Sequence, residues 1–210
     1  MTQLNDARNA LRRELRRARR QLTPAQQQRA AVQLLEQWQR HFHAVPGRVA
    51  LYLANDGEVS LQPLLQWLQC NRAEITLPVL HPFSGNALLF QRYMNTTPMH
   101  LNRFGIEEPV LDCTAVRLVP QHDMILLPLV GFDAAGNRLG MGGGFYDRTL
   151  AGLIEADKRP LLLGVAHECQ QVRNLPVESW DIPLDGILTP AGFISASSRI
   201  LDANTKGHHI

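Results

Sequence analysis

The residues from Gly136 to Arg148 read GNRLGMGGGFYDR, and five of these thirteen residues are glycines. The segment lies between a predicted strand and a predicted helix, where backbone N–H groups point outward and favour an anion. Glycine lets the backbone adopt positive φ angles and lets a bulky anion approach without a Cβ clash. The pattern therefore indicates a phosphate-binding loop, with a purely structural loop as the alternative.

The familiar catalytic motifs do not fit this chain. A P-loop needs a lysine where this segment has none, and a GxGxxG motif starting at Gly140 would have Phe145 at its third glycine. There is also no HExxH motif, no zinc-spaced Cys/His cluster and no GxSxG elbow. The chain offers arginines, glycines and carboxylates, which are the groups that catalyse phosphoryl transfer by positioning and charge neutralisation.

The first twenty residues are strongly basic. Seven arginines stand there against Asp6 and Glu14, a local net charge of +5 in a chain whose net charge is +2. Small and apolar residues recur every three or four positions and predict one amphipathic helix, with the stripe Leu4, Ala7, Leu11, Leu15, Ala18 and Leu22. Arginines fill the rest of its circumference, which suggests an anionic partner: nucleic acid, a membrane surface or a phosphorylated small molecule.

The remaining elements alternate along the chain. A second helix is predicted after Thr23, a typical N-cap, with Pro24 at its first position. The predicted strands are 47–54, 74–80, 86–93, 124–130, 159–167 and 184–193, and the further helices are 60–69 and 144–157. The alternation predicts an α/β fold: a single domain over residues 1–200 with a mostly parallel sheet covered on both faces, then a flexible tail at 201–210.

The three cysteines, Cys70, Cys113 and Cys169, are far apart and form no CxxC pair. We expect them to be reduced and buried, as in a cytoplasmic protein. The N-terminus has no apolar signal region, and no apolar run reaches the length of a membrane span. We therefore expect a cytoplasmic protein that does not enter a membrane.

The stretch LPLVGFDAAGNRLGMGGGFYDR, residues 127–148, resembles the signature of the 5-formyltetrahydrofolate cyclo-ligase family, also called methenyltetrahydrofolate synthetases. Further pieces agree in order: RNALRREL with Arg8 and Arg12, LYLANDGEVS with Glu58, FGIEEP with Phe104, and PLDGIL with Asp185. The resemblance covers about residues 5 to 195. It implies a three-layer α/β fold akin to ribose-phosphate isomerases and CoA transferases.

The resemblance also implies an activity. Such proteins convert 5-formyltetrahydrofolate and MgATP into 5,10-methenyltetrahydrofolate, ADP and phosphate, through a phosphorylated formyl group. ATP and the folate, with or without a polyglutamate tail, would be the ligands and Mg²⁺ the cofactor. We expect a monomer without a nucleic-acid partner.

The family pattern transfers roles to particular positions of this chain. It implies ATP binding by Arg8, Arg12, Arg138, Leu139, Gly140, Met141, Gly142, Gly143, Gly144, Phe145 and Tyr146. It implies folate binding by Leu53, Glu58, Phe104, Gly142, Gly144 and Tyr146. It implies catalytic roles for Arg138, Gly143 and Asp147, and metal binding by Asp147 and Asp185.

Two positions depart from the family pattern. Arg8 stands where the family has lysine, and Gly143 stands where many members have a lysine within the loop. The first change keeps the charge but alters its geometry, and the second removes one phosphate-facing charge.

Two other functions compete at this stage. The arginine-rich helix could bind nucleic acid, which predicts steep salt dependence and binding without ATP. The fold could also serve a sugar-phosphate isomerase or an acyl-transfer enzyme, since fold does not determine function.

Overall fold

The protein is described by a computed structural model that covers residues 2–153 and 159–200. Its α-helices are α1 (Thr2–Arg20), α2 (Pro24–His41), α3 (Gln62–Cys70) and α4 (Phe145–Leu150). Its strands are β1 (Arg48–Ala50), β2 (Glu74–Leu80), β3 (Leu88–Arg92), β4 (Met99–Leu101), β5 (Glu107–Pro109), β6 (Val116–Arg117), β7 (Met124–Pro128), β8 (Gly131–Phe132), β9 (Arg138–Leu139), β10 (Leu161–Val165), β11 (Gly186–Thr189) and β12 (Gly192–Ser195). Short 3₁₀ turns are η1 (Cys113–Ala115), η2 (Val119–Gln121), η3 (Ala151–Leu153) and η4 (Glu168–Gln170).

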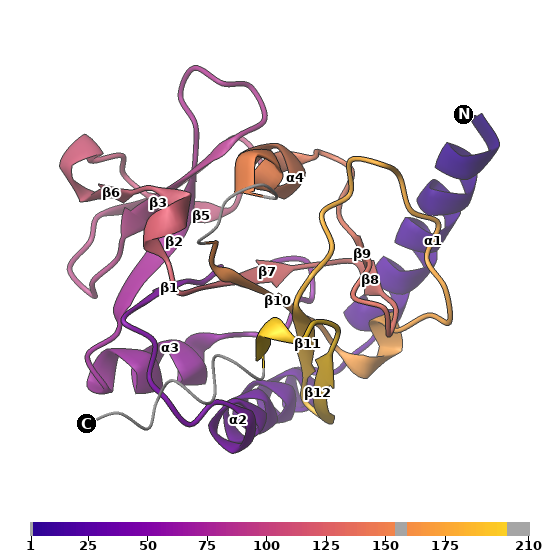
Figure 1. The fold of residues 1–210 in the computed structure, drawn as a ribbon, viewed down its shortest axis with the longest axis horizontal. Coiled ribbons are helices and arrows are strands. Elements are labelled where there is room, and N and C mark those ends of the chain that lie inside the picture. The colour runs from indigo at the N-terminus through magenta and orange to yellow at the C-terminus, as the bar shows by residue number, and fades with distance from the viewer. Residues whose placement is uncertain (1, 154–158, 201–210) are drawn as a thin grey trace.

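One eight-stranded sheet crosses the molecule in the order β12-β11-β10-β7-β1-β2-β3-β6 (Figure 1). The five neighbours from β11 to β2 pair in parallel. At the two edges β12, β3 and β6 pair antiparallel. The mostly parallel sheet predicted from the alternating pattern is therefore confirmed.

Helices cover both faces of this sheet, α2 and α3 below and α4 above in the orientation of Figure 1. Leu34 and Trp38 of α2 pack with Leu64 of α3 into the lower core. Leu150 of α4 and Leu153 belong to the core on the other face. Strands buried on both faces carry continuous apolar runs, which is why 124–128 and 161–165 are so apolar.

The start of α2 follows the sequence prediction. Thr23 Oγ1 accepts from the Gln26 backbone N–H at 3.3 Å, and Gln26 Oε1 accepts from the Thr23 N–H at 2.8 Å. This capping box satisfies two groups that the helix end leaves unpaired, and Pro24 needs no partner there.

Several predicted elements differ from the structure. The single strand expected at 184–193 is a hairpin of β11 and β12, because the chain reverses at Pro190 and Ala191. The helix expected over 144–157 ends at Leu150 and continues as η3, and its residues 154–157 lie outside the described part of the chain, as does the tail at 201–210. The hairpins β4–β5 and β8–β9 were not predicted, and all three cysteines are exposed rather than buried.

Helix α1 stands at the side of the sheet, beside the β8–β9 hairpin (Figure 1). Leu15 is buried and packs closely on Gly131. A Cβ added at Gly131 would lie 2.5 Å from the Cδ1 atom of Leu15. The predicted apolar stripe is not wholly buried, and the arginines do not all face solvent. Ala7 is exposed, whereas Arg8 and Arg19 are buried.

Asp185, directly before β11, is fully buried and anchors the C-terminal part of the domain. Its Oδ2 atom accepts from Arg159 at 2.9 Å, from Arg199 at 3.1 Å and from the Leu162 backbone N–H at 2.9 Å. Its Oδ1 atom accepts from Arg159 at 3.0 Å. Both carboxylate oxygens are therefore engaged by the surrounding chain.

We predict that Asp185→Asn lowers the free energy of unfolding by about 2–3 kcal/mol, because it leaves two guanidinium groups without their buried counter-charge. The melting temperature should fall by about 5–10 °C in a domain of this size. Calorimetry of this variant beside Glu36→Gln, an exposed helix position, tests the prediction. Equal melting temperatures for the two variants would contradict it.

Candidate active site

The glycine-rich loop is positioned by the β8–β9 hairpin. Asp133 Oδ1 accepts from the backbone N–H groups of Ala135 at 3.0 Å and Asn137 at 3.2 Å, which closes the turn. Gly136 completes it at φ +83°, where a Cβ would lie 2.8 Å from the Leu184 carbonyl oxygen. The FDxxGxR part of the segment is therefore a rigid hairpin that delivers Arg138 and the loop that follows.

The loop itself depends on glycine at particular positions. Gly142 has φ +98° and Gly144 has φ +66°, conformations that side chains disfavour. At Gly143 a Cβ would lie 2.8 Å from the ring of Phe145. The loop lysine of many family members is thus incompatible with the position of Phe145 in this chain.

Arg138 and Asp147 form an ion pair across the two ends of the loop. The Arg138 side chain is only 4% exposed. Its Nε–H is buried and has no hydrogen-bond partner anywhere in residues 2–153 and 159–200. A buried donor without a partner is rare, and here it adjoins a loop suited to an anion.

Two further arginines touch the loop backbone. Arg12 Nε donates to the Gly140 carbonyl oxygen at 2.9 Å. The Arg12 guanidinium group also lies against Gly142, where an added Cβ would be 3.7 Å from the guanidinium carbon. Burial lowers the pKa of Arg12, and the neighbouring charge of Arg8 lowers it further. Arg148 Nη1 donates to the Gly143 carbonyl oxygen at 2.6 Å, a contact that the sequence analysis missed.

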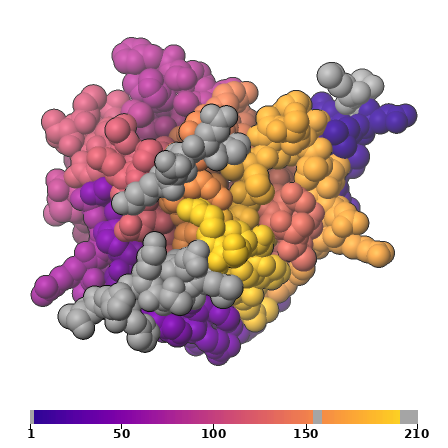
Figure 2. Space-filling view, in the orientation of Figure 1, coloured from indigo at the N-terminus to yellow at the C-terminus, as the bar shows by residue number. Residues whose placement is uncertain are grey.

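Arg8 is turned toward a different segment. Its Nη1 donates to the Pro176 carbonyl oxygen at 2.7 Å, and its Nη2 lies 3.0 Å from Asp181 Oδ1. Figure 2 shows the orange segment that contains these residues packed beside the indigo helix α1. Arg8 therefore holds residues 176–181 against α1, and an ATP phosphate would have to share it with Asp181.

Glu58 lies in a tight turn after β1. Its Oε2 accepts from the Asn55 backbone N–H at 3.0 Å, and Asp56 and Gly57 both have positive φ. Its side chain is 13% exposed, and Arg19 Nη2 lies 3.6 Å from its Oε1. Burial raises the pKa of Glu58, and the hydrogen bond from Asn55 and the charge of Arg19 oppose that rise.

The Glu58 turn and the glycine loop lie close to each other, since Arg19 Nη2 is near both Glu58 and Met141. Burial raises the pKa of Tyr146, next to the loop, and the nearby charge of Glu58 raises it further while Arg138 lowers it. β1 and β7 are parallel neighbours, so their carboxyl ends meet at one edge of the sheet. The chain leaves β1 toward the Glu58 turn and leaves β7 toward the β8–β9 hairpin, and this brings the two segments together.

Aromatic residues border the other side of the loop. The ring of Phe104, between β4 and β5, packs edge-on against Phe145 with centroids 5.7 Å apart. Beside them is an open hollow of about 300 Å³ between the β2–β3 turn and the β4–β5 hairpin. Its lining includes Phe145, His81, His100 and Arg103.

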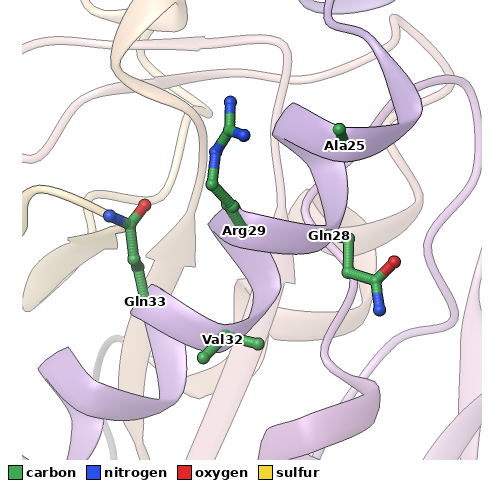
Figure 3. A pocket seen from close by; sticks show the side chains of 5 residues that line it. All are labelled: Ala25, Gln28, Arg29, Val32 and Gln33. Carbon is green, nitrogen blue, oxygen red and sulfur yellow. The ribbon is translucent and has the colours of Figure 1, made fainter.

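A second hollow lies on the outer face of α2 and is unrelated to this site. Ala25, Gln28, Arg29, Val32 and Gln33 line it, and Figure 3 shows that all five come from this one helix. Walls from a single convex helix cannot enclose a ligand, since ligand sites are concave and bury most of their ligand.

The structure brings most of the predicted site residues together. Around the loop it gathers Arg12, Arg138, Gly140, Met141, Gly142, Gly143, Gly144, Phe145, Tyr146 and Asp147, with Glu58 and Phe104 beside them. Leu139 is fully buried, and Leu53 packs against the lower core. Asp185 does not join Asp147 in any metal-binding group, and the described residues hold no cluster of three or more His, Cys, Asp or Glu that could bind a metal.

The contacts of Asp56, Arg19 and Asp181 were not predicted from the sequence. Arg16, Arg19 and Arg20 all reach the carboxylate of Asp56. The spacing of Arg8, Arg12, Arg16 and Arg20 places them near one another along α1, but it does not distinguish Arg19 or identify the carboxylates that these arginines contact.

Known proteins share this architecture. The model of the 5-formyltetrahydrofolate cyclo-ligase family matches residues 5–190. The 5-formyltetrahydrofolate cyclo-ligase of Haemophilus influenzae is 46% identical over 188 aligned positions, and the alignment covers 86% of this chain and 96% of that protein. The Escherichia coli K12 protein of the same name is 44% identical over 178 residues, 84% of this chain and 97% of its own.

Solved structures agree with these matches. The 5,10-methenyltetrahydrofolate synthetase of Aquifex aeolicus superposes with a TM-score of 0.76 at 29% identity, covering 90% of this chain and 92% of that one. The Mycoplasma pneumoniae synthetase superposes with a TM-score of 0.69 at 23% identity, which supports the fold alone. Since the family model spans the loop, the Glu58 turn and α1, and the relatives align over nearly their whole length, the chain belongs to the 5-formyltetrahydrofolate cyclo-ligase family.

Proposed function

We propose that this protein closes the ring of 5-formyltetrahydrofolate to 5,10-methenyltetrahydrofolate, with ATP hydrolysed to ADP and phosphate. The observation that carries the proposal is the buried, unpartnered Nε–H of Arg138 beside the glycine loop. It offers a positive charge and a free donor to a transferring phosphoryl group. Family membership and the names of the relatives point to the same reaction.

The proposed reaction requires no protein nucleophile. The formyl group is an amide, and its oxygen is a poor leaving group. In the proposed reaction this oxygen attacks the γ-phosphorus of ATP, the bond to ADP breaks, and an iminium phosphate results. The neighbouring aniline nitrogen then attacks the formyl carbon and loses its proton, and the C–O bond breaks to release phosphate. The protein has to align two substrates and neutralise charge.

The residues divide between the two substrates. We assign the phosphates to Gly140, Gly142, Gly143, Gly144, Arg12 and Arg138, with Arg8, Leu139 and Met141 at the nucleotide side. We assign the pterin to Glu58, because a carboxylate can accept from two neighbouring N–H donors of its edge. Tyr146, Leu53, Phe145 and Phe104 then flank the aromatic rings of the folate.

The glutamyl end of the folate fits the hollow beside Phe104. His81 Nδ1 accepts from the backbone N–H groups of Phe83 at 3.2 Å and Ser84 at 3.0 Å, which leaves its Nε2 as a donor. Arg103 stacks over Phe104 with its Cζ 5.0 Å from the ring centroid, and donates to the Gly85 carbonyl oxygen. Donors of this kind suit the carboxylates of a glutamate or polyglutamate tail.

We propose that Asp147 would bind Mg²⁺ together with the phosphates of ATP. Asp147 lies in the first turn of α4, at the end of the loop, and within residues 2–153 and 159–200 its Oδ1 is engaged by Arg138. Mg²⁺ takes one or two carboxylates together with waters and phosphate oxygens, so this carboxylate suits the ion. When bound, the ion neutralises charge on the phosphates. The contacts of Asp185 with Arg159 and Arg199 favour a structural role for that residue over the predicted metal role.

The competing functions are less well supported. Nucleic-acid binding by α1 is less well supported because three of its seven arginines, Arg8, Arg12 and Arg19, are engaged by the protein itself. Among the helices of the described residues none is both long and apolar enough to cross a membrane. We propose a monomeric enzyme of the cytoplasm.

One assay tests the proposed function against its competitors. The purified protein is incubated with 5-formyltetrahydrofolate, with and without MgATP, while methenyl absorbance and ADP are measured. We expect both products to rise together and only with MgATP. A sugar-phosphate isomerase or an acyl-transfer enzyme would form neither, and this result would overturn the proposal.

We predict that Arg12→Ala raises the apparent Michaelis constant for ATP by about tenfold or more, because a charge-assisted contact near the phosphates contributes roughly 1.5–3 kcal/mol. Arg17→Ala is the matched control, since Arg17 is an exposed arginine of the same helix. It should change that constant less than about twofold. Small and equal effects of both substitutions would remove Arg12 from the ATP site.

Glu58→Gln should weaken folate binding by about tenfold to a hundredfold, because it removes the charge and turns one acceptor into a donor that faces donors. ATP binding should stay unchanged. Calorimetric titration of both ligands measures the two affinities separately. An unchanged folate affinity, or an equal loss for ATP, would place Glu58 outside the pterin site.

Asp147→Asn should raise the Mg²⁺ concentration needed for half-maximal turnover and lower turnover by about tenfold to a hundredfold, because it removes the carboxylate beside the phosphates. Asp185→Asn should leave that Mg²⁺ concentration unchanged, because its role is structural. Turnover measured against Mg²⁺ at saturating ATP compares the two. A shift in both variants would restore Asp185 as a second ligand.

A further inference from the structure

Arg19 is a fully buried arginine at the C-terminal end of α1. Its Nε donates to the Asp56 carbonyl oxygen at 2.8 Å, and its Nη1 donates to the Leu129 carbonyl oxygen at 3.0 Å. Its Nη2 donates to Asp56 Oδ2 at 2.7 Å and lies 3.6 Å from Glu58 Oε1 and 3.9 Å from the sulfur of Met141. One guanidinium group thus touches the Glu58 turn, the segment after β7 and the glycine loop.

The contact between α1 and Asp56 carries more positive than negative charge. Arg16, Arg19 and Arg20 all pair with the single carboxylate of Asp56. Burial raises the pKa of Asp56, but hydrogen bonds from these three arginines outweigh burial and hold it well below its usual range. One ionised carboxylate facing three guanidinium groups leaves an excess of positive charge beside Glu58. Arg16 and Arg20 are partly exposed to water, but Arg19 is fully buried, and Glu58 is a second carboxylate beside it.

We propose that Arg19 is a positioning residue for folate binding, which keeps the Glu58 carboxylate charged and turned toward the glycine loop. The proposal rests on the proposed function, in which Glu58 accepts from the pterin. Arg19 does not touch the substrate in this scheme and acts through Glu58.

The turn that carries Glu58 is fitted to the end of α1. A Cβ at Gly57 would lie 3.2 Å from the Arg19 carbonyl oxygen, so the backbones approach closely there. Gln27 Nε2 donates to the Gly57 carbonyl oxygen at 3.0 Å. The turn therefore has a defined position relative to Arg19, and the 3.6 Å contact follows from it.

The groups that face Glu58 determine its response to pH. Arg19 and Arg16 favour its charged form, whereas burial and the charge of Asp56 favour its neutral form. The phenols of Tyr52 and Tyr146 also face it, and burial together with Glu58 raises the pKa of both. Removing the charge of Arg19 therefore raises the pKa of Glu58 further, so the carboxylate loses its charge at a higher pH than in the unaltered protein.

The test uses four variants of the full chain and one ligand. Calorimetry measures the dissociation constant of 5-formyltetrahydrofolate without ATP at about pH 7 and about pH 9, a range in which an unperturbed Glu stays ionised. Arg19→Met removes the charge and keeps the length, and Arg19→Lys keeps the charge. Asp56→Asn removes a negative neighbour of Glu58, and Asn tolerates the positive φ of this position. Arg17→Met is the exposed control on the same helix.

We expect Arg19→Met to weaken binding by about tenfold at pH 7 and by clearly less at pH 9, because a higher pH favours the charged form of Glu58. We expect no such rise in folate affinity between pH 7 and pH 9 for the unaltered protein, Arg17→Met or Asp56→Asn. A structural role alone would weaken binding by the same factor at both pH values. That outcome, or an unchanged affinity at pH 7, overturns the proposal.

Thermal unfolding shows whether Arg19→Met is folded. If Arg19→Met is not folded, Arg19→Lys provides the test. Because it keeps the charge, we expect its folate affinity to depend on pH as that of the unaltered protein does, and to lie within about threefold of it at pH 9. A loss above about tenfold at both pH values would overturn the positioning role. Failure of the unaltered protein to bind 5-formyltetrahydrofolate rejects the proposed function instead. Normal binding by the unaltered protein and by Arg19→Met rejects only the role of Arg19.

Discussion

The inward-facing arginines of α1 are the interaction on which the rest of the site depends. Arg8 pairs with Asp181, Arg12 binds the carbonyl oxygen of Gly140, and Arg19 binds Asp56. These partners belong to three segments that are far apart in the sequence and lie outside the central sheet. Without α1 they would be surface loops with few apolar contacts of their own, and such loops are mobile. One basic helix therefore gives the site its shape.

The same arrangement suits a reaction that has no protein nucleophile. A buried guanidinium group with an unpartnered Nε–H, that of Arg138, stands at the start of the glycine loop. Preorganised donors of this kind stabilise charge that develops in the transition state without any reorganisation at that moment. The β8–β9 hairpin, closed by Asp133 and Gly136, supports Arg138 from behind. Catalysis thus depends on the positions of these groups, and the fold has to be rigid where the loop begins.

Much of the fold could be predicted from local patterns. The apolar runs at 124–128 and 161–165 read correctly as buried strands, and Thr23 and Pro24 indicated the start of α2. The hairpin of β11 and β12 could not be separated from one longer strand, because apolar residues continue on both sides of its turn. The short hairpins β4–β5 and β8–β9 escaped prediction because two or three residues carry no periodicity.

The sequence by itself determined the chemistry on offer: a glycine-rich loop, seven arginines near the N-terminus and carboxylates at Glu58 and Asp147. Local sequence could not reveal which arginines face inward, because helical periodicity describes one element and not its neighbours. The parallel pairing of β1 with β7 decided that the Glu58 turn and the glycine loop share one edge of the sheet. The tertiary structure also surrounded Asp185 with Arg159 and Arg199 and exposed the cysteines, because burial and charge pairing depend on segments that meet only when the chain folds.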